Sequence, residues 1–331
     1  MTRPAAHERP LATMLLLAYQ QAGSIEQAIR GALAQTHVPL EIVISDDAST
    51  DGTWAAIERA VAGYTGPHRL VLNRNPVNLG IGAHINKMVA LSRGELLFVA
   101  AGDDISLPQR CALVVDAWLS ADRQPDLISS NLLDLDEHGQ THATITPTDL
   151  STYRNAADWL ARPPHVIGAA QAWTRRVFDR FGPLPHGSVA EDWLMVFRAI
   201  VSGGAITLAE PLVQYRRGGI SRRRRNLHAR DVIERLLKNN RHALVELPQL
   251  LADATRAGQL AAVEDALSLQ FAREVFVRDL FGATSLGQRW RAFTAARRVP
   301  LALRTRLLVY AAWPALLAPL FALKRLTTRD R

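Results

Sequence analysis

The sequence predicts an α/β fold with a mostly parallel sheet flanked by helices, and three features indicate it. Along residues 11–131, short apolar runs of strand length alternate with segments whose apolar residues have helical spacing. Two of these runs, Ile42–Ile44 and the one within Glu95–Asp104, are typical of parallel strands buried on both faces. After residue 216, strand-forming residues become scarce and Ala, Leu, Arg and Glu dominate. We therefore expect the sheet to be followed by a helical C-terminal appendage.

The expected elements alternate from the first apolar run onward. Pro10 precedes the strand Leu11–Ala18, and Ser24 with Gln27 three residues later is typical of a capping box that begins a helix. Gly94 is expected to end a later helix as a C-terminal cap. The other strands of this region are expected at Ile42–Ile44, Leu70–Asn73, within Glu95–Asp104 and at Asp126–Asn131, and the helices at about 24–35, 51–62, 83–92 and 108–121.

The regular alternation ends after residue 131. Short helices are expected at Thr152–Leu160, Arg175–Phe181 and Ser188–Ser202, and two short strands at Ala205–Leu208 and Leu212–Tyr215. Residues 226–300 have a helical pattern throughout. The chain is thus expected to consist of an N-terminal tail at 1–10, an α/β domain at 11–221 and a helical region at 222–331.

The composition is that of a globular protein with an unevenly placed positive charge. The net charge is +8, and six arginines fall within residues 216–225. A basic surface suits phosphates, nucleic acid or anionic lipid, but no interleaved aromatics or zinc-finger spacing accompany these arginines, so nucleic acid is not an expected partner. The single cysteine, Cys111, excludes an intramolecular disulfide, and no secretory signal is recognisable. A cytoplasmic location is therefore expected.

Adjacent carboxylates end two of the expected strands. Asp46–Asp47 follows Ile42–Ile44, and Asp103–Asp104 ends the run that begins at Glu95. Turn and cap chemistry accounts for the hydroxyl residues nearby, but paired like charges at the end of a buried strand cost stability unless something compensates them. Ligands in open α/β sheets bind outside the carboxyl ends of the strands, so both pairs are expected to line one crevice.

A bound divalent cation would compensate these charges. Mg²⁺ or Mn²⁺ is commonly held by one or two carboxylates together with phosphate oxygens. The two pairs therefore indicate a site for a metal ion and a diphosphate. A third pair, Glu191–Asp192, begins an expected helix, where the helix dipole also favours acids. Its pattern leaves a structural role and a general-base role open.

Seven motifs stand in a specific order between Leu11 and about Ser221. They are Ala18-Tyr19 with Gln35, Glu41–Thr53, Asn78-Leu79-Gly80, Gly94-Glu95, Gly102-Asp103-Asp104, Gly168–Pro183 and Glu191-Asp192. With these motifs the chain resembles the family 2 glycosyltransferases, inverting enzymes that use nucleotide-sugar donors. The resemblance implies the GT-A fold, which has a Rossmann-like sheet.

The resemblance also implies roles for individual residues. Asp104 would be the direct ligand of a Mg²⁺ or Mn²⁺ ion that bridges the donor diphosphate, and Asp192 would deprotonate the acceptor hydroxyl as it attacks the anomeric carbon. Glu191 and Trp193 would lie on the acceptor side. The donor-binding residues would be Ala18, Tyr19, Asp47, Asp103 and Asp104.

The chain departs from the family pattern in three places. Gln20 replaces a common Asn, and Ala101 stands where many members carry the first Asp of a longer acidic motif, so metal coordination would rest on Asp104 alone. Tyr215–Ser221 only loosely resembles the segment that closes over the donor in relatives. A phosphate role for Arg216 or Arg217 therefore stays open, beside that of a solvated basic loop.

The expected function is transfer of a sugar from a nucleotide sugar, with a UDP-sugar as the expected donor. The acceptor would be a glycan or a lipid-linked glycan in bacterial-type cell-surface polysaccharide synthesis. A polyprenyl-phosphate sugar transferase of the same fold has the same donor site and is the alternative. A non-catalytic nucleotide-binding scaffold is disfavoured because all three acidic pairs are present. A phospho-receiver domain is disfavoured by the length of the chain.

The C-terminal segment 299–325 contains seventeen uncharged residues, Leu307–Leu323, between flanking arginines and Lys324. This run is slightly short for a membrane span and is interrupted by prolines. A buried helical hairpin and an interfacial segment anchored by Trp313 both fit the pattern. In the second case the protein would be peripheral at the cytoplasmic face of the inner membrane, on an anionic lipid surface.

Overall fold

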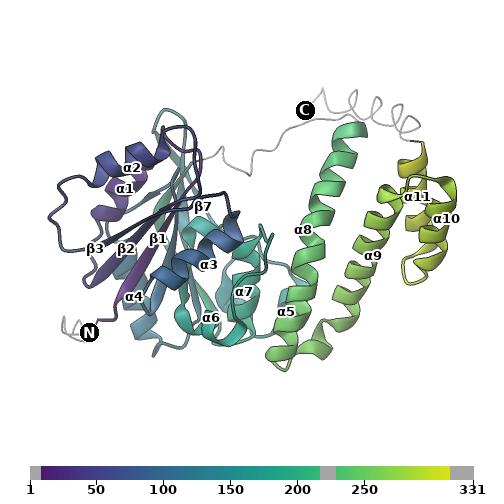
Figure 1. Cartoon of the computed structure of the whole chain (residues 1–331). Helices are drawn as coiled ribbons and strands as arrows, with labels where there is room; N and C mark the ends of the chain where they lie inside the picture. The colour runs from purple at the N-terminus through teal and green to yellow at the C-terminus, as the bar shows by residue number, and fades with distance from the viewer. Residues whose placement is uncertain (1–8, 217–228, 314–331) are drawn as a thin grey trace. The chain divides into compact units, whose positions relative to one another are not determined.

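The computed structural model describes residues 9–216 and 229–313. The chain divides into two compact units, which we call the sheet unit and the helical unit. The sheet unit comprises Met1–Arg222 with Arg256–Gln259, and the helical unit comprises Arg223–Thr255 with Leu260–Arg331 (Figure 1). Three segments in which sequence features were identified lie wholly or partly outside the described residues: the tail 1–10, the arginine run 216–225 and the end of 299–325.

One mixed sheet organises the sheet unit. Its strand order is β3-β2-β1-β4-β8-β6-β9-β5, and β7 pairs with β6 at the side of this path. The strands β1 to β4 pair in parallel, as do β6 and β9, whereas β8 is antiparallel to both β4 and β6. The bounds are β1 Ala12–Ala18, β2 Leu40–Asp46, β3 Arg69–Arg74, β4 Leu96–Ala101, β5 Ile105–Ser106, β6 Leu127–Leu135, β7 Thr141–Ile145, β8 Ala172–Thr174 and β9 Ala205–Arg216.

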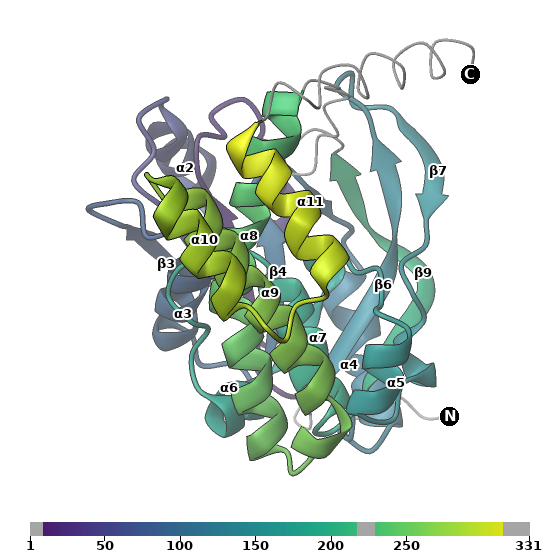
Figure 2. The same cartoon turned by 90° about the vertical axis from the view of Figure 1, so that its right-hand side faces the viewer.

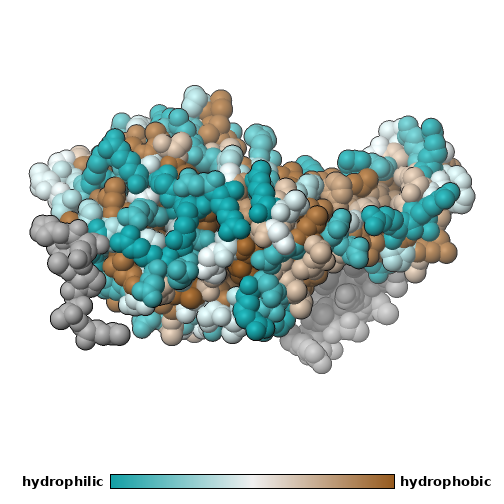
Figure 3. Space-filling view, turned by 90° about the horizontal axis from the view of Figure 1, so that it is seen from below, coloured by the Kyte–Doolittle hydropathy of each residue, from teal (hydrophilic) through white to brown (hydrophobic). Residues whose placement is uncertain are grey.

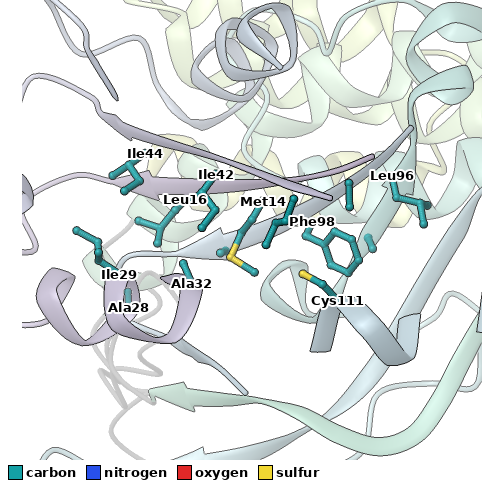
Figure 4. Packing of buried hydrophobic residues seen from close by; sticks show 14 of the residues in the cluster. Met14, Leu16, Ala28, Ile29, Ala32, Ile42, Ile44, Leu96, Phe98 and Cys111 are labelled. Carbon is teal, nitrogen blue, oxygen red and sulfur yellow. The ribbon is translucent and has the colours of Figure 1, made fainter. Parts of the chain in front are cut away.

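Helices cover both faces of this sheet, which confirms the predicted α/β class. On one face, α1 (Ile25–Leu33), α2 (Thr53–Val61) and α4 (Arg110–Ser120) pack on alternate residues of β1, β2 and β4. Figure 4 shows Met14, Leu16 and Phe98 of this core beside helix residues such as Ile29 and Cys111. The intervening strand residues, such as the buried Leu15, point to the opposite face. That face carries α3 (Ile81–Leu91), α6 (Arg175–Phe181) and α7 (Glu191–Ile200), and α5 (Ala156–Ala161) packs near α7.

The strand expected at Asp126–Asn131 is observed as β6. The three-residue β8, which was not expected, lies antiparallel between β4 and β6. One expectation about the strands is wrong, namely that Ala205–Leu208 and Leu212–Tyr215 form separate strands. They belong to one strand, β9, whose middle is accommodated by register shifts against β6 near Asn131.

Two local expectations about caps are also wrong. Ser24 does not cap α1 with its side chain; its hydroxyl donates instead to the carbonyl of Gly102, at 2.9 Å. Gly94 lies two residues beyond the cap Ser92 and has no left-handed backbone. A side chain at Gly94 would lie 2.5 Å from the Thr13 amide nitrogen, so glycine is required there by the close approach of β1.

The helical unit consists of long helices around a smaller core. It contains α8 (Ala229–Arg256), α9 (Glu264–Gly282), α10 (Leu286–Ala295) and α11 (Leu301–Ala312), and Figure 2 shows α10 and α11 in front of α9. Phe276, Leu280 and Leu307 are among its buried residues. Hydrophobic residues also reach its surface among hydrophilic ones (Figure 3). Among the described residues, no helix is both long and apolar enough to cross a membrane.

Candidate functional site

The carboxyl ends of β1, β2 and β4 meet at one edge of the sheet. In the parallel register, Ala18 pairs with Asp46, and Leu17 pairs with Ala101. The register therefore brings together the residues that follow these strand ends, which are Tyr19, Asp47 and Asp103–Asp104.

Asp46 is fully buried and is compensated by its own turn. Its carboxylate accepts hydrogen bonds from the backbone N–H and the hydroxyl of Ser49, and Arg74 Nε lies 3.5 Å away. This arrangement gives Asp46 a structural role in the turn after β2.

Asp47 is held by three hydrogen bonds from protein donors. Its Oδ1 accepts from Asn75 Nδ2 at 2.8 Å and from the Leu79 N–H at 2.9 Å, and its Oδ2 accepts from the Gly80 N–H at 3.0 Å. The Asn78-Leu79-Gly80 motif thus binds Asp47 through its backbone, immediately before α3. A carboxylate offers about four lone-pair positions. One position on Oδ2 therefore has no described protein donor.

The loop after β1 is fixed to the loop after β2. The Ala18 carbonyl accepts from the Asp47 N–H at 2.9 Å, and the Gln20 N–H donates to Ser49 Oγ at 2.8 Å. Gln20 has a left-handed backbone, with φ of 55°. Tyr19 lies between these contacts and is 49% exposed, so its ring is available at the edge of the sheet.

Asp103 and Asp104 are compensated less completely than Asp47. The pKa of Asp104 is raised to about 8, chiefly by burial and then by the Asp103 carboxylate, although the Arg216 N–H, which donates to Asp104 Oδ1 at 2.8 Å, opposes this shift. Burial also raises the pKa of Asp103, against a hydrogen bond from the Gln21 side chain. The positive groups nearby are therefore not sufficient to keep the pKa values of these two carboxyls at their ordinary level.

This pair fits a metal ion only as a partial ligand set. The described residues contain no cluster of three or more His, Cys, Asp or Glu side chains that could hold a metal by themselves. Mg²⁺ and Mn²⁺ accept one or two carboxylates when phosphate oxygens and water complete the coordination. The two carboxylates of Asp103 and Asp104 suit that arrangement, and the buried Asp104 is the better candidate for a direct metal ligand.

Arg216 joins the end of β9 to the acidic pair. Besides its N–H bond to Asp104, its Nε donates to the Asp103 carbonyl at 3.1 Å, and a guanidinium nitrogen donates to Gln27 Oε1 at 2.8 Å. Its guanidinium is thus already engaged with protein acceptors. Arg217 lies outside the described residues, so a phosphate role for it stays a prediction.

Asp192 lies at the start of α7 in an enclosed setting. Burial raises the pKa of its carboxyl, while hydrogen bonds from the backbone N–H groups of Trp193 and Gly168 lower it. A Cβ at Gly168 would lie 3.3 Å from Asp192 Cβ and from Glu191 Oε1, so glycine leaves the room that this pair occupies. A carboxyl with a raised pKa is closer to the proton affinity that a general base needs near neutral pH.

A hydrogen-bonded bridge connects α7 to β4. Gln171 Nε2 donates to the Asp192 carbonyl at 3.4 Å, and the Gln171 carbonyl accepts from Arg110 at 3.1 Å. Arg110 is 1% exposed and also donates to the Val99 carbonyl of β4 at 2.9 Å. The bridge ties the helix that carries Asp192 to the strand that leads to Asp104.

The two other predicted acceptor-side residues, Glu191 and Trp193, lie next to Asp192 on α7. Glu191 is buried, with 7% exposure. The Trp193 ring packs on Trp159 with centroids 4.5 Å apart. Their position beside Asp192 is compatible with an acceptor pocket, and an acceptor role stays a prediction.

Two residues at this edge were not predicted from the sequence. Gln21 and His84 carried no motif, because a lone Gln in a loop and a His without metal-ligand spacing give no signal. The Asn78-Leu79-Gly80 motif did give a signal, but its function as a donor set for Asp47 depends on a contact across more than thirty residues.

Comparisons with known proteins give matches to one family model and to several relatives. The model of the family described as Glycosyl transferase family 2 matches residues 13–178, half of the chain. The succinoglycan biosynthesis protein ExoO of Rhizobium meliloti is 29% identical over 238 residues, which are 67% of this chain and 66% of ExoO. EpsE of Bacillus subtilis is 29% identical over 139 residues, 42% of this chain. The matched region spans about half of EpsE, 49% of its length.

Solved structures share the fold at low sequence identity. TarS of S. aureus, residues 1–349 in complex with UDP-GlcNAc, has a TM-score of 0.56 at 17% identity and covers 92% of this chain and 87% of its own. The mannosyltransferase PcManGT of Pyrobaculum calidifontis, in complex with GDP-Man and Mn²⁺, has a TM-score of 0.52 at 20% identity and covers 98% and 89%.

The raised pKa of Asp104 makes a prediction about stability in the absence of metal. The folded protein holds this proton with a pKa of about 8, against an ordinary value of 3.8. The protonated Asp104 therefore contributes its full stabilisation below the pKa of the unfolded chain, near 3.8, and this contribution is lost as the pH rises through 8. We expect the free energy of unfolding of the wild type, in EDTA, to fall relative to that of Asp104→Asn between about pH 5 and pH 8.

Denaturant unfolding at a series of pH values measures this difference. Asp179→Asn, at an exposed position on α6, is the matched control. A difference between wild type and Asp104→Asn that stays constant over this pH range would contradict the burial argument.

Proposed function

The chain belongs to glycosyltransferase family 2, and on that premise we propose that residues 11–221 transfer a sugar from a nucleotide-sugar donor to an acceptor hydroxyl with inversion at the anomeric carbon. One observation carries the proposal. The Asp103 and Asp104 carboxyls, whose pKa values are raised by burial, lie at the same sheet edge as Tyr19 and Asp47. Such an edge suits a nucleoside diphosphate bound together with a cation.

The nucleoside would bind between the loops after β1 and β2. Asp47 would accept a hydrogen bond from the base or ribose at the position on Oδ2 that its three protein donors leave open. The exposed Tyr19 ring would lie against the nucleoside, and Ala18 would fix the loop through its carbonyl. Asp103 would bind the donor beside them.

The cation would be Mg²⁺ or Mn²⁺, held by Asp104 with oxygens of the diphosphate and water. When bound, it would supply Lewis-acid stabilisation of the departing nucleoside diphosphate. Support comes from the buried carboxyl itself and from PcManGT, whose solved complex contains GDP-Man and Mn²⁺.

Asp192 would act as the general base. It would accept the proton of the acceptor hydroxyl while that oxygen forms a bond to the anomeric carbon, and the bond from that carbon to the diphosphate oxygen would break with its electron pair. This single displacement inverts the anomeric configuration. Glu191 and Trp193 would border the acceptor.

The expected substrate class follows from the relatives and the structural neighbours. The name of ExoO connects that protein to succinoglycan biosynthesis, and the TarS structure contains UDP-GlcNAc. We infer a UDP-sugar donor and a glycan or lipid-linked acceptor in cell-surface polysaccharide synthesis. A polyprenyl-phosphate acceptor is the alternative, which an acceptor screen would distinguish.

Two substitutions should separate donor binding from chemistry. Asp192→Asn removes the base but leaves the donor edge intact, so we expect nucleotide affinity near that of the wild type and a loss of turnover of about a hundredfold or more. Asp104→Ala removes the metal carboxylate, so the dependence of nucleotide binding on Mn²⁺ should disappear. Calorimetric titration and product formation measure the two effects.

Each variant is the control for the other. Turnover of Asp192→Asn equal to that of the wild type would remove Asp192 from the base role. Binding by Asp104→Ala that still rises with Mn²⁺ would remove Asp104 from the metal site.

We further propose that the segment 299–325 holds the protein at the cytoplasmic face of the inner membrane. Among its described residues, Leu301 and Trp313 are 61% and 54% exposed. The sequence carries no Asp or Glu from residue 280 to residue 329, whereas arginines recur. Exposed tryptophan and a purely basic charge suit an anionic bilayer surface.

Removal of residues 313–331, which takes away Trp313 together with Lys324 and Arg325, should release the protein from membranes. This truncation spares Val299 and Leu307, which are buried in the helical unit. We expect the full chain, but not the truncated one, to sediment with vesicles that contain phosphatidylglycerol. Equal sedimentation of both proteins, or equal binding to neutral phosphatidylcholine vesicles, would contradict the proposal.

A further inference from the structure

His84 lies buried beneath the donor edge and takes no part in the mechanism above. It belongs to α3, is 2% exposed, and its Nε2 lies 2.6 Å from the hydroxyl oxygen of Ser45 on β2. Burial lowers the pKa of His84, against the opposing effect of the Asp47 and Asp46 carboxylates. A neutral imidazole can accept the Ser45 hydroxyl proton at Nε2.

A continuous chain of side-chain hydrogen bonds leads from His84 to Asp47. Asn73 Nδ2 donates to Ser45 Oγ and to Asn75 Oδ1, both at 2.9 Å, and Asn75 Nδ2 donates to Asp47 Oδ1 at 2.8 Å. We call Ser45, Asn73 and Asn75 the relay.

The hydrogen bonds of the relay run outward from Asn73, toward His84 at one end and toward Asp47 at the other. Because Asn73 gives one amide hydrogen to Ser45, the Ser45 hydroxyl is free to give its own hydrogen to His84. Because Asn73 gives its other hydrogen to the Asn75 carbonyl oxygen, the Asn75 amide nitrogen is the atom that faces Asp47. The orientation of the Asn73 amide therefore determines the orientations of both the Ser45 hydroxyl and the Asn75 amide.

α3 thus reaches Asp47 by two routes. The residues that precede its first turn, Leu79 and Gly80, donate backbone N–H bonds directly to the carboxylate. His84, in the body of the same helix, reaches it through the relay. Both oxygens of the carboxylate are therefore held, Oδ1 by Asn75 and Leu79 and Oδ2 by Gly80.

From this geometry we propose that His84 is a positioning residue for the nucleotide donor, acting through Ser45, Asn73 and Asn75 on the Asp47 carboxylate. The inference rests on the proposed donor role of Asp47. It assigns His84 an effect on nucleotide affinity and none on the proton transfer at Asp192. Ser45 and Asn75 are almost fully buried, so water does not readily replace a lost member of the relay.

Substitution of His84 tests this proposal. The probe is whichever of UDP, GDP and dTDP binds the wild type most tightly with Mn²⁺. His84→Leu keeps a similar volume but offers no nitrogen to Ser45, and we expect its dissociation constant to rise about tenfold, the equivalent of one lost buried hydrogen bond. His84→Gln keeps a polar group within reach of Ser45 and should restore most of the affinity.

A second buried histidine gives the matched control. His68 is 5% exposed and its Nε2 lies 2.9 Å from the Gln35 carbonyl, outside the relay. His68→Leu should lower the melting temperature without changing the dissociation constant. If His84→Leu changes nucleotide affinity no more than His68→Leu does, the proposal is wrong.

The relay itself is tested by a double-mutant cycle. Ser45→Ala should weaken nucleotide binding as His84→Leu does, and the double variant should be no weaker than either single one, because residues of one network are not additive. Additive losses would contradict the relay. Should His84→Leu fail to fold, Ser45→Ala with wild-type affinity would overturn the proposal on its own.

The cycle also separates this proposal from the proposed function. A wild-type protein that binds none of the three nucleotides contradicts the donor site as a whole. A wild type that binds one of them, with variants that bind it equally well, contradicts only the role of His84.

Discussion

The site depends on how the fold accommodates four carboxylates at one edge of a buried sheet. Each carboxylate must lose water, and each needs a partner to remain charged. Asp46 accepts hydrogen bonds from Ser49 and lies beside Arg74, and Asp47 accepts hydrogen bonds from three N–H donors. Asp104 obtains a single described backbone N–H, and burial raises its pKa to about 8. This unequal compensation favours the neutral form of Asp104, and it is the reason why we propose that a cation binds there.

Hydrogen bonds also connect the elements that surround the site. The donor loops are bound to each other through Gln20 and Ser49, and the start of α7 is bound to β4 through Gln171 and Arg110. A transferase must hold donor and acceptor groups in one geometry, since orientation supplies much of the rate enhancement. The enclosed position of Asp192, with a raised pKa, suits a base that works within such a framework.

Much of this architecture could be predicted from the sequence, because apolar runs and helical spacing of apolar residues mark most of its strands and helices. Strands β1 to β4 coincide with apolar runs, two of which end on adjacent acids, and the expected helix Arg175–Phe181 has the observed bounds. The three-residue β8 is too short to give a periodic signal. The partners of Asp47 could not be predicted either, because Asn75 and Gly80 reach it across about thirty residues through the tertiary fold. Local periodicity does not record such contacts.

The most direct test of the central claim is thermal stabilisation of the purified full-length protein by nucleotide sugars. UDP-, GDP- and dTDP-sugars would each be added with Mn²⁺ and, separately, with EDTA. A ligand that binds the folded state raises the melting temperature by mass action. The account predicts that at least one nucleotide sugar does so with Mn²⁺ and that EDTA abolishes the shift. A flat response to all of them in the presence of Mn²⁺ would contradict it.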